Sequence, residues 1–467
     1  MKISDFKKLN LILGWLCFLI AFIVYFFTSE PTVSFWDTGE YITTSSKLQV
    51  GHPPGAPLYQ MLGAFFSIFA FGKENIGFVM NLMSGFASAL TIAFMYWSII
   101  LILLKIVKTK KEFELKKNFA ISGAALVGCL SFTFTDSFWF NAVEAEVYAM
   151  ATLIMAVLFY LGLRWESDMH KPRGDKWLLL ISFVIGLSFG VHFMGLLTIP
   201  AIFLIYYFKN SKEINAKYGL SLKSGFVIAN IIGLVILMGV FKLILPNTLK
   251  FFSVIELLFV NNFGLPFNSG TLAAFVILGF TFYYLIDFTI KKKLITANTI
   301  VLCFLFIFIG FSSWLILPIR ANANVVVNEN NPSNARELLA YYNLEQYPKT
   351  HLFYGPLFSD QYSGMDEDKN KRYKDDNPKY EKDLEKNKYV IVNDYKDALQ
   401  NYNSDHASIL PRMWSSEHAV NYLNYTGFLD FKIKPSYSNE SELQDFILEF
   451  KNELNSGQID YEDYHNF

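Results

Sequence analysis

Long apolar runs dominate the first two thirds of this sequence. A helix needs about 20 apolar residues to cross a hydrocarbon core of about 30 Å, and nine segments before residue 319 have the composition and approximate length for this. They are residues 9–28, 76–104, 119–135, 147–163, 177–190, 193–208, 225–245, 271–290 and 297–318. The pattern therefore predicts a mainly α-helical integral membrane protein with about nine transmembrane helices.

A further apolar stretch, residues 56–71, is short and follows the helix-breaking sequence Gly-His-Pro-Pro-Gly-Ala-Pro. If it lies in the membrane interface instead of crossing, the cytoplasmic loops collect 20 basic residues and the outer loops only three, Lys47, Lys73 and Lys250. This threading is favoured because cytoplasmic loops are enriched in lysine and arginine. It places the N-terminus inside and makes residues 29–75 a long first outer loop that follows the membrane surface.

The composition changes after Ile319. Charged residues number 40 among the first 319 positions and 41 among the last 148. We therefore expect a multi-span membrane domain, 1–319, and a soluble domain, 320–467, on the outer side. More than half of residues 359–389 are charged, which predicts a solvated loop. A strand at 389–392 and an amphipathic helix predict a small α+β domain; the helix carries Leu443, Phe446, Ile447, Phe450 and Leu454 on one face.

Charge and cysteine content argue against nucleic-acid binding and against structural roles for the cysteines. The net charge is −1 and there is no basic stripe, which argues against a nucleic-acid binder. All three cysteines lie in apolar runs, so neither a disulfide framework nor a cysteine zinc site is predicted. Lysine outnumbers arginine 34 to 6, which is typical of an AT-rich coding sequence and points to a bacterium. The expected location is therefore a bacterial inner membrane.

Ionisable residues within the predicted spans are few. They are Lys242 and Asp287, each near a span end, where a long side chain can reach the interface. Transporters place polar groups or broken helices near the bilayer midplane. The candidate chemistry lies instead at the outer ends of the spans.

Two acids follow the first span in the sequence Ser-Phe-Trp-Asp-Thr-Gly-Glu-Tyr, residues 34–41. Asp37 and Glu40 are three residues apart and would share one face of a helix. A carboxylate near a low-dielectric boundary can take a proton from an alcohol. The alternative is a helix start whose acids offset the helix dipole.

Other candidate side chains lie at the same outer surface. His52 lies in the double-proline turn, Glu144 and Glu146 precede the fourth span, and His192 lies in a tight turn between two short spans. Each also has a structural explanation, as a turn residue or, for the acids, as dipole compensation. Arg320 directly follows the last span, where a guanidinium can hold two phosphate oxygens. Interfacial anchoring is its alternative role.

Together these motifs resemble a known membrane family. They are Trp36–Tyr41, Gly51–Tyr59, Ala142–Tyr148, and Pro318–Arg320 leading into Asn331 and Pro332. They are similar to the family catalogued as domain of unknown function 2723, whose eukaryotic relatives are transmembrane protein O-mannosyltransferases. The similarity covers about residues 30–360. Bacterial members are commonly longer, with more spans after the point where this sequence stops, so a short or incomplete member is expected.

The resemblance implies an inverting glycosyltransferase of the GT-C type. Such an enzyme takes a sugar, for example mannose, from a polyprenyl-phosphate carrier and places it on an acceptor hydroxyl of a protein or glycan outside the cytoplasm. An acid of the first outer loop activates the acceptor, and Asp37 fits that position. The adjacent Asp-Glu pair of better-studied relatives is split here by Thr38 and Gly39, so Glu40 is expected to contribute less.

The expected site therefore has Asp37 and Glu40 as catalytic acids. The residues expected to bind the donor phosphate or substrate are Arg320, His52, His192, Glu144 and Glu146. A divalent metal is compatible with these side chains, and no other cofactor is indicated. Two other functions fit the sequence: a flippase for lipid-linked sugars or another transporter, and a membrane scaffold whose C-terminal domain binds a partner.

Overall fold

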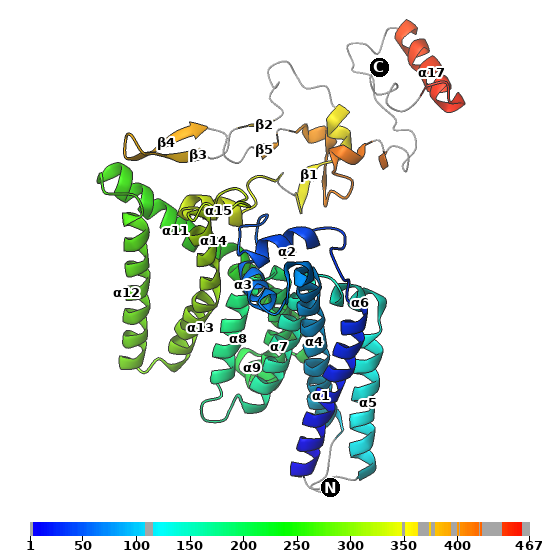
Figure 1. The fold of residues 1–467 in the computed structure, drawn as a ribbon, viewed down its shortest axis with the longest axis vertical. Helices are drawn as coiled ribbons and strands as arrows, with labels where there is room; N and C mark the ends of the chain where they lie inside the picture. Colours follow the sequence, from blue (N-terminus) through cyan, green and yellow to red (C-terminus); the bar gives the residue numbers. More distant parts are fainter. Residues whose placement is uncertain are drawn as a thin grey trace. The chain divides into compact units, whose positions relative to one another are not determined.

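The structure of the chain is a computed structural model (Figure 1). It describes residues 3–107, 115–347, 351–362, 373–374, 379–393, 399–400, 402–419, 421–422 and 441–459. Contacts divide the chain into two compact units. The first comprises Met1–Leu344 and Glu385–Lys388, and the second comprises Glu345–Leu384 and Tyr389–Phe467.

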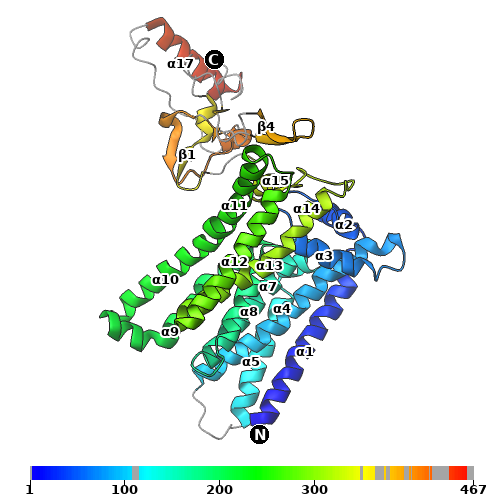
Figure 2. The same ribbon diagram turned by 90° about the vertical axis from the view of Figure 1, so that its left-hand side faces the viewer.

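The first unit is a bundle of apolar helices, and each of the nine predicted spans falls on one of them. The helices are α1 (Ile3–Thr28), α4 (Ile76–Ile106), α5 (Leu115–Thr133), α7 (Val147–Asp168), α8 (Lys176–Ser188), α9 (Thr198–Tyr218), α10 (Leu222–Met238), α12 (Ser269–Lys291) and α13 (Ile295–Phe311). Figure 2 shows α1, α4 and α5 running side by side. The chain is thus a multi-pass membrane protein.

Helix length and hydropathy support fewer membrane spans than the nine that the sequence pattern predicts. Within the described residues, seven helical stretches are long and apolar enough to cross a membrane. An eighth would be α5 together with the short helix α6 (Asp136–Ala142), which is bent from it by 67°. The 13-residue α8 is shorter than this measure requires. A count of nine therefore remains a prediction.

The loop between α1 and α4 contains two short helices, α2 (Thr38–Ser46) and α3 (Pro57–Ser67), and a 3₁₀ turn, η1 (Lys73–Asn75). With 11 residues, α3 is only about 16 Å long, roughly half of a hydrocarbon core. It begins with proline, which suits a first helical turn. Apolar side chains on and after it are exposed, among them Phe65, Ile68, Phe69 and Phe71. These features fit the prediction that 56–71 lies in the interface.

Of the two ionisable residues predicted near span ends, Asp287 lies near the end of α12, whereas Lys242 lies midway along a continuous helical stretch, Leu222–Asn262. Lys242 lies in a π-helical segment, Gly239–Ile244, that joins α10 to α11 (Leu245–Leu257), and its ammonium is 4.6 Å from the centre of the Phe241 ring. Asp287 pairs with Lys291 in the last turns of α12, at 2.7 Å. Both contacts are local, so neither residue marks a pathway through the bundle.

The helices α8 and α13 approach closely at a pair of glycines. A Cβ atom on Gly186 would overlap the carbonyl oxygen of Ile307, and one on Gly310 would overlap that of Phe183. Small residues are what let membrane helices approach so closely. The contact fixes the position of α13, which continues through a 3₁₀ turn, Ser312–Leu315, into α14 (Ile316–Ala321).

The first unit continues past Ile319 to Leu344 because the segment after α14 packs back onto the bundle. This segment ends in α15 (Ala335–Tyr342), whose Tyr341 and Tyr342 are buried in the same core cluster as Tyr41 and Tyr59 of the first outer loop. The hydrophobic core therefore extends directly beneath that loop.

The second unit contains three two-stranded sheets and a helix. The pairs are β1 (Tyr354–Pro356) with β6 (Ala407–Ile409), β2 (Tyr373–Lys374) with β5 (Leu399–Gln400), and β3 (Lys379–Asp383) with β4 (Lys388–Asn393); the helix is α17 (Ser441–Ser456). The predicted strand at 389–392 lies in β4, and the predicted amphipathic helix is α17, so the α+β class is confirmed.

The predicted solvated loop 359–389 is wrong at its C-terminal end, where β3 and the turn into β4 lie. The consecutive charged residues Glu381, Lys382 and Asp383 of β3 are exposed or half-buried, so this two-stranded hairpin carries them without burying charge. A 3₁₀ turn, Phe358–Tyr362, opens the predicted loop. Residues 363–372 and 375–378 of it are outside the described residues.

The predicted threading can be tested by labelling single cysteines in a chain whose three native cysteines are replaced by alanine. Cysteines at the exposed positions Lys73 and Ala323 should react with a membrane-impermeant maleimide added to intact cells. A cysteine at the exposed His170, between α7 and α8, should react only after permeabilisation. Labelling of Lys73 or Ala323 only from the cytoplasm would refute the threading.

Candidate functional site

Asp37 stands at the start of α2. It is the N-cap residue of that helix, and its side chain is 58% exposed. Glu40 lies in the first helical turn, so the two acids share one face, as their spacing predicts. The preceding Trp36 has a left-handed φ of 62°, which is uncommon for a bulky residue and makes the turn into the helix tight.

His52 meets this pair of acids. Its backbone N–H donates a hydrogen bond to Glu40 Oε1 (2.6 Å), and its ring Nδ1 is 2.9 Å from Glu40 Oε2. The other ring nitrogen, Nε2, is 3.8 Å from Asp37 Oδ2. The Tyr41 ring packs beside the imidazole, with ring centres 5.8 Å apart. The double-proline turn thus brings a histidine to the acids at the start of α2.

These contacts couple the protonation of His52 and Glu40. The hydrogen bond to Glu40 raises the pKa of His52 against the effect of partial burial, and the charge of Asp37 adds to the rise. Partial burial acts to raise the pKa of Glu40, but the hydrogen bonds from His52 outweigh it and lower the pKa. The favoured state is therefore an imidazolium–carboxylate pair with Asp37 beside it.

Glu144 and Glu146 form a second group of acids near Asp37. They precede α7, where Glu146 is the N-cap residue, and both are 5% exposed. Burial, together with the charges of Asp37 and Glu144, raises the pKa of Glu146 to about 7, and the backbone N–H groups of Val147 and Asp37 oppose the rise. Both acids are therefore buried side chains that lie next to the turn of Asp37.

Arg320, on α14, lies at the opposite end of α2 from Asp37. Its Nε donates to the carbonyl oxygen of Leu48 (2.6 Å) and its Nη2 to that of Lys47 (3.4 Å). A cation suits this C-terminal end of a helix. The ten residues from Asp37 to Lys47 place Arg320 roughly 15 Å from the acid along the helix axis. Arg320 is therefore not part of the Asp37–His52 cluster.

His192 is also separate from that cluster in its contacts. Its Nδ1 accepts a hydrogen bond from the backbone N–H of Met194 (3.1 Å), and its ring packs against Tyr148, with centres 5.3 Å apart. Burial lowers the pKa of His192, so the ring is neutral near pH 7. A neutral ring can donate or accept a hydrogen bond but brings no positive charge to a phosphate.

Three hydrogen bonds that sequence reasoning missed hold the turn of His52 in place. The N–H of Val50 donates to the carbonyl oxygen of Val327 (3.0 Å), and the N–H of Glu329 donates to that of Val50 (3.2 Å). The hydroxyl of Tyr341 donates to the carbonyl oxygen of Gly51. The segment after α14 thus binds the first outer loop, although the two are far apart in the sequence.

The sequence does contain a signal for the helix α15, which holds this turn. Asn334 caps α15 by accepting hydrogen bonds from the N–H groups of Arg336 and Glu337, which is a recognisable helix start. Leu338, Tyr341 and Tyr342 then follow at helical spacing. The pattern predicts a buried helix, although it does not indicate which surface the helix covers.

The three clustered residues are also arranged to hold a metal ion. Within the described part of the chain, Asp37, Glu40 and His52 form the group in which one ligand atom from each residue lies within 4.8 Å of the others. Two carboxylates and an imidazole suit a divalent cation. Such an ion would have to compete with the hydrogen bonds that His52 makes to Glu40.

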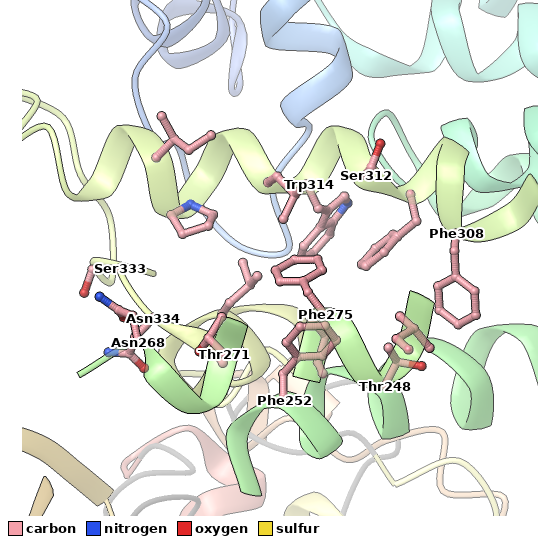
Figure 3. A pocket seen from close by; sticks show the side chains of 18 of the residues that line it. Thr248, Phe252, Asn268, Thr271, Phe275, Phe308, Ser312, Trp314, Ser333 and Asn334 are labelled. Carbon is pink, nitrogen blue, oxygen red and sulfur yellow. The ribbon is translucent and has the colours of Figure 1, made fainter. Parts of the chain in front are cut away.

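A cavity of about 510 Å³ lies between α11, α12, α13, α14 and α15. Figure 3 shows aromatic rings in its middle, including those of Phe252, Phe275 and Trp314, and polar side chains of Asn268, Ser333 and Asn334 at one end. Its wall includes Pro318 and Ile319 of α14, the helix that carries Arg320. A long apolar chain with a polar head fits such a lining.

Comparisons with known proteins place the acid cluster within a matched region. Residues 37–215 match the protein O-mannosyl-transferase TMEM260 N-terminal domain, and residues 348–445 match DUF8416, a family of unknown function. No solved structure matches the chain.

Two curated relatives are similar over part of their length. The chain is 25% identical over 240 residues to protein O-mannosyl-transferase tmem260 of Dictyostelium discoideum, covering 49% of this chain and 27% of the relative. It is 27% identical over 156 residues to protein O-mannosyl-transferase TMEM260 of Mus musculus, covering 32% of this chain and 19% of the relative. The chain thus spans about a quarter or less of the relatives it matches.

The pair of His52 and Glu40 should stabilise the fold most at mildly acidic pH. A lowered pKa of Glu40 contributes stability above its ordinary value of 4.5, and a raised pKa of His52 contributes stability below its ordinary value of 6.5, which is lost as the pH rises through the raised value. His52→Gln should therefore cost about 1 to 3 kcal/mol at pH 6 and less at pH 9, measured by unfolding in detergent.

The exposed His170 offers a matched control, since His170→Gln should change stability little at either pH. An equal cost of His52→Gln at pH 6 and pH 9 would contradict the ion pair.

Proposed function

We propose that this protein is an inverting membrane glycosyltransferase of the GT-C type. It transfers a hexose such as mannose from a polyprenyl phosphate to a hydroxyl group on a protein, at the non-cytoplasmic face of a bacterial inner membrane. The observation that carries the proposal is the exposed Asp37, fixed beside His52 and Glu40 in a region that matches the N-terminal domain of O-mannosyl-transferases. The asymmetry of basic residues supports the sidedness.

Asp37 is the proposed general base. It is more exposed than Glu40, whose carboxylate accepts two hydrogen bonds from His52. In the transfer, an acceptor O–H gives its proton to Asp37 while the oxygen bonds to the anomeric carbon of the sugar. The bond from that carbon to the phosphate oxygen breaks, and its electron pair leaves with the lipid phosphate. A free carboxylate beside a partly buried cluster suits this proton transfer.

Glu40 and His52 are proposed to orient the base. The imidazolium of His52 lies between the two carboxylates, 2.9 Å from Glu40 and 3.8 Å from Asp37. Its ring nitrogen beside Asp37 limits the directions in which that carboxylate can turn. Both carboxylate oxygens of Glu40 are hydrogen-bonded to His52, so its contribution to transfer is indirect.

The donor is proposed to lie with its polyprenyl chain in the 510 Å³ cavity and its phosphate near Arg320. The cavity wall and Arg320 share α14. Two nitrogens of Arg320 bind the end of α2, and within the described residues Nη1 makes no hydrogen bond, so it is the proposed phosphate donor. An inverting reaction has its base and leaving group on opposite sides of the sugar, which the two ends of α2 provide.

Asp37→Asn should abolish transfer while leaving the fold intact, because the amide cannot accept the proton. A general base contributes about 10²- to 10⁴-fold, so the loss should fall in that range, and Glu40→Gln should lose less. The assay is transfer of radiolabelled mannose from polyprenyl-phosphate mannose to membrane proteins by the purified full chain in nanodiscs.

The exposed Glu74→Gln, in the same outer loop, is the control and should transfer at the normal rate. Near-normal transfer by Asp37→Asn would exclude Asp37 as the base.

Arg320→Ala should lower turnover and donor affinity together, since a phosphate gains charge as the glycosidic bond breaks. The loss of a charge-assisted hydrogen bond predicts an effect of about tenfold or more on donor affinity. Arg320→Lys should recover only part of it, because lysine keeps the charge but loses the planar fork. The affinity for polyprenyl-phosphate mannose and the affinity for the same lipid without sugar are each measured, separately from transfer.

If Arg320→Ala folds normally and binds both lipids as well as the parent protein does, Arg320 serves only to brace α2.

A further inference from the structure

The turn that carries Asp37 is tied to a buried carboxylate. Ser34 Oγ is 2.8 Å from Glu144 Oε2 and 3.1 Å from the hydroxyl of Thr38. A serine hydroxyl has only one proton, and an ionised carboxylate only accepts. The Ser34 hydroxyl is the donor in both contacts, so its one proton is shared between Glu144 Oε2 and Thr38 Oγ1. Ser34 and Thr38 flank Asp37, so this chain of hydrogen bonds closes the turn around it.

The start of the same loop is fixed through its backbone. The N–H of Glu30 donates to the carbonyl oxygen of Val143 (3.0 Å), next to Glu144. Asn81 of α4 donates from Nδ2 to the carbonyl oxygens of Glu30 (2.7 Å) and Thr32 (2.9 Å). Two side chains that precede α7 act on the turn itself: Glu144 through Ser34, and Glu146 through the backbone N–H of Asp37.

Glu144 meets Ser34 from a buried position. It is 5% exposed, and among the described residues no ion pair joins it to a basic side chain. A glutamine at this position would accept the same hydrogen bond from Ser34. The acceptor oxygen is therefore the feature of Glu144 that acts on the turn.

We infer that Glu144, acting through Ser34, is a positioning residue for Asp37. This inference rests on the proposed function, in which Asp37 is the base. The link from Glu144 to Ser34 and on to Thr38 fixes the direction in which α2 starts, and with it the direction of the Asp37 carboxylate. A base displaced by about 1 Å can lose about 10²-fold in rate, so the link should affect turnover more than substrate binding.

The test uses the purified full chain in nanodiscs with polyprenyl-phosphate mannose as donor. Ser34→Ala and Glu144→Ala should each lower kcat between about 10- and 100-fold while leaving donor KM unchanged. The double variant should lose no more than the worse single variant, because both changes break one link. Glu144→Gln keeps an acceptor oxygen for Ser34 and should recover most of the loss.

The control is again Glu74→Gln, an exposed acid of the same loop that should keep normal kcat and KM. If Glu144→Ala does not fold, Ser34→Ala and Glu144→Gln carry the test. Losses that multiply in the double variant, a rise in donor KM without a fall in kcat, or a Ser34→Ala enzyme with normal kcat would each overturn the inference. Failure of the proposed function is distinguished from these, since Asp37→Asn would then retain transfer.

Discussion

The hydrogen bonds between His52 and Glu40 are the contact on which the candidate site depends. They join the first turn of α2 to the double-proline turn. The same contact holds the His52 ring 3.8 Å from Asp37. The apolar spans supply no reacting group of their own; they provide a rigid base on which the loop is fixed.

The loop is held from two directions. At its start, Asn81 and the turn before α7 bind its backbone and Ser34. At its later part, Arg320, Val327 and Tyr341 bind the backbone from Lys47 to Gly51. Both sets of contacts come from elements far away in the sequence. This arrangement supports a cluster of carboxylates that would repel one another in a looser loop, as is common where pKa values are shifted at functional sites.

Much of this arrangement follows from the sequence, and the rest depends on the path of the chain. Apolar length predicted the long helices, and the spacing of apolar residues predicted the amphipathic helix that is α17. The interfacial placement of 56–71 rests on the asymmetry of basic residues and stays a prediction. The spacing of Asp37 and Glu40 predicted their shared face. The meeting of His52 with Glu40 could not be predicted, because it depends on how the turn from Lys47 to Gly51 is folded. Likewise, a guanidinium after a span suggests a phosphate, yet two of its nitrogens bind carbonyl oxygens of Lys47 and Leu48. The charges at 379–389 suggested a loop because charge content alone does not exclude a solvent-facing hairpin.

The short helix α3 has a consequence for the lipids around the protein. Its exposed phenylalanines suit a position in the membrane interface, and the backbone N–H groups of Leu58 and Tyr59 at its start donate to the carbonyl oxygen of Gly190, just after α8. The height of the acid cluster is thus fixed by the protein, whereas the height of a lipid headgroup varies with the thickness of the membrane. For the proposed transfer, thin and thick bilayers of defined chain length would present the lipid donor at different depths relative to the acid cluster. Acyl-chain length would then affect the rate of that transfer without any change in the protein.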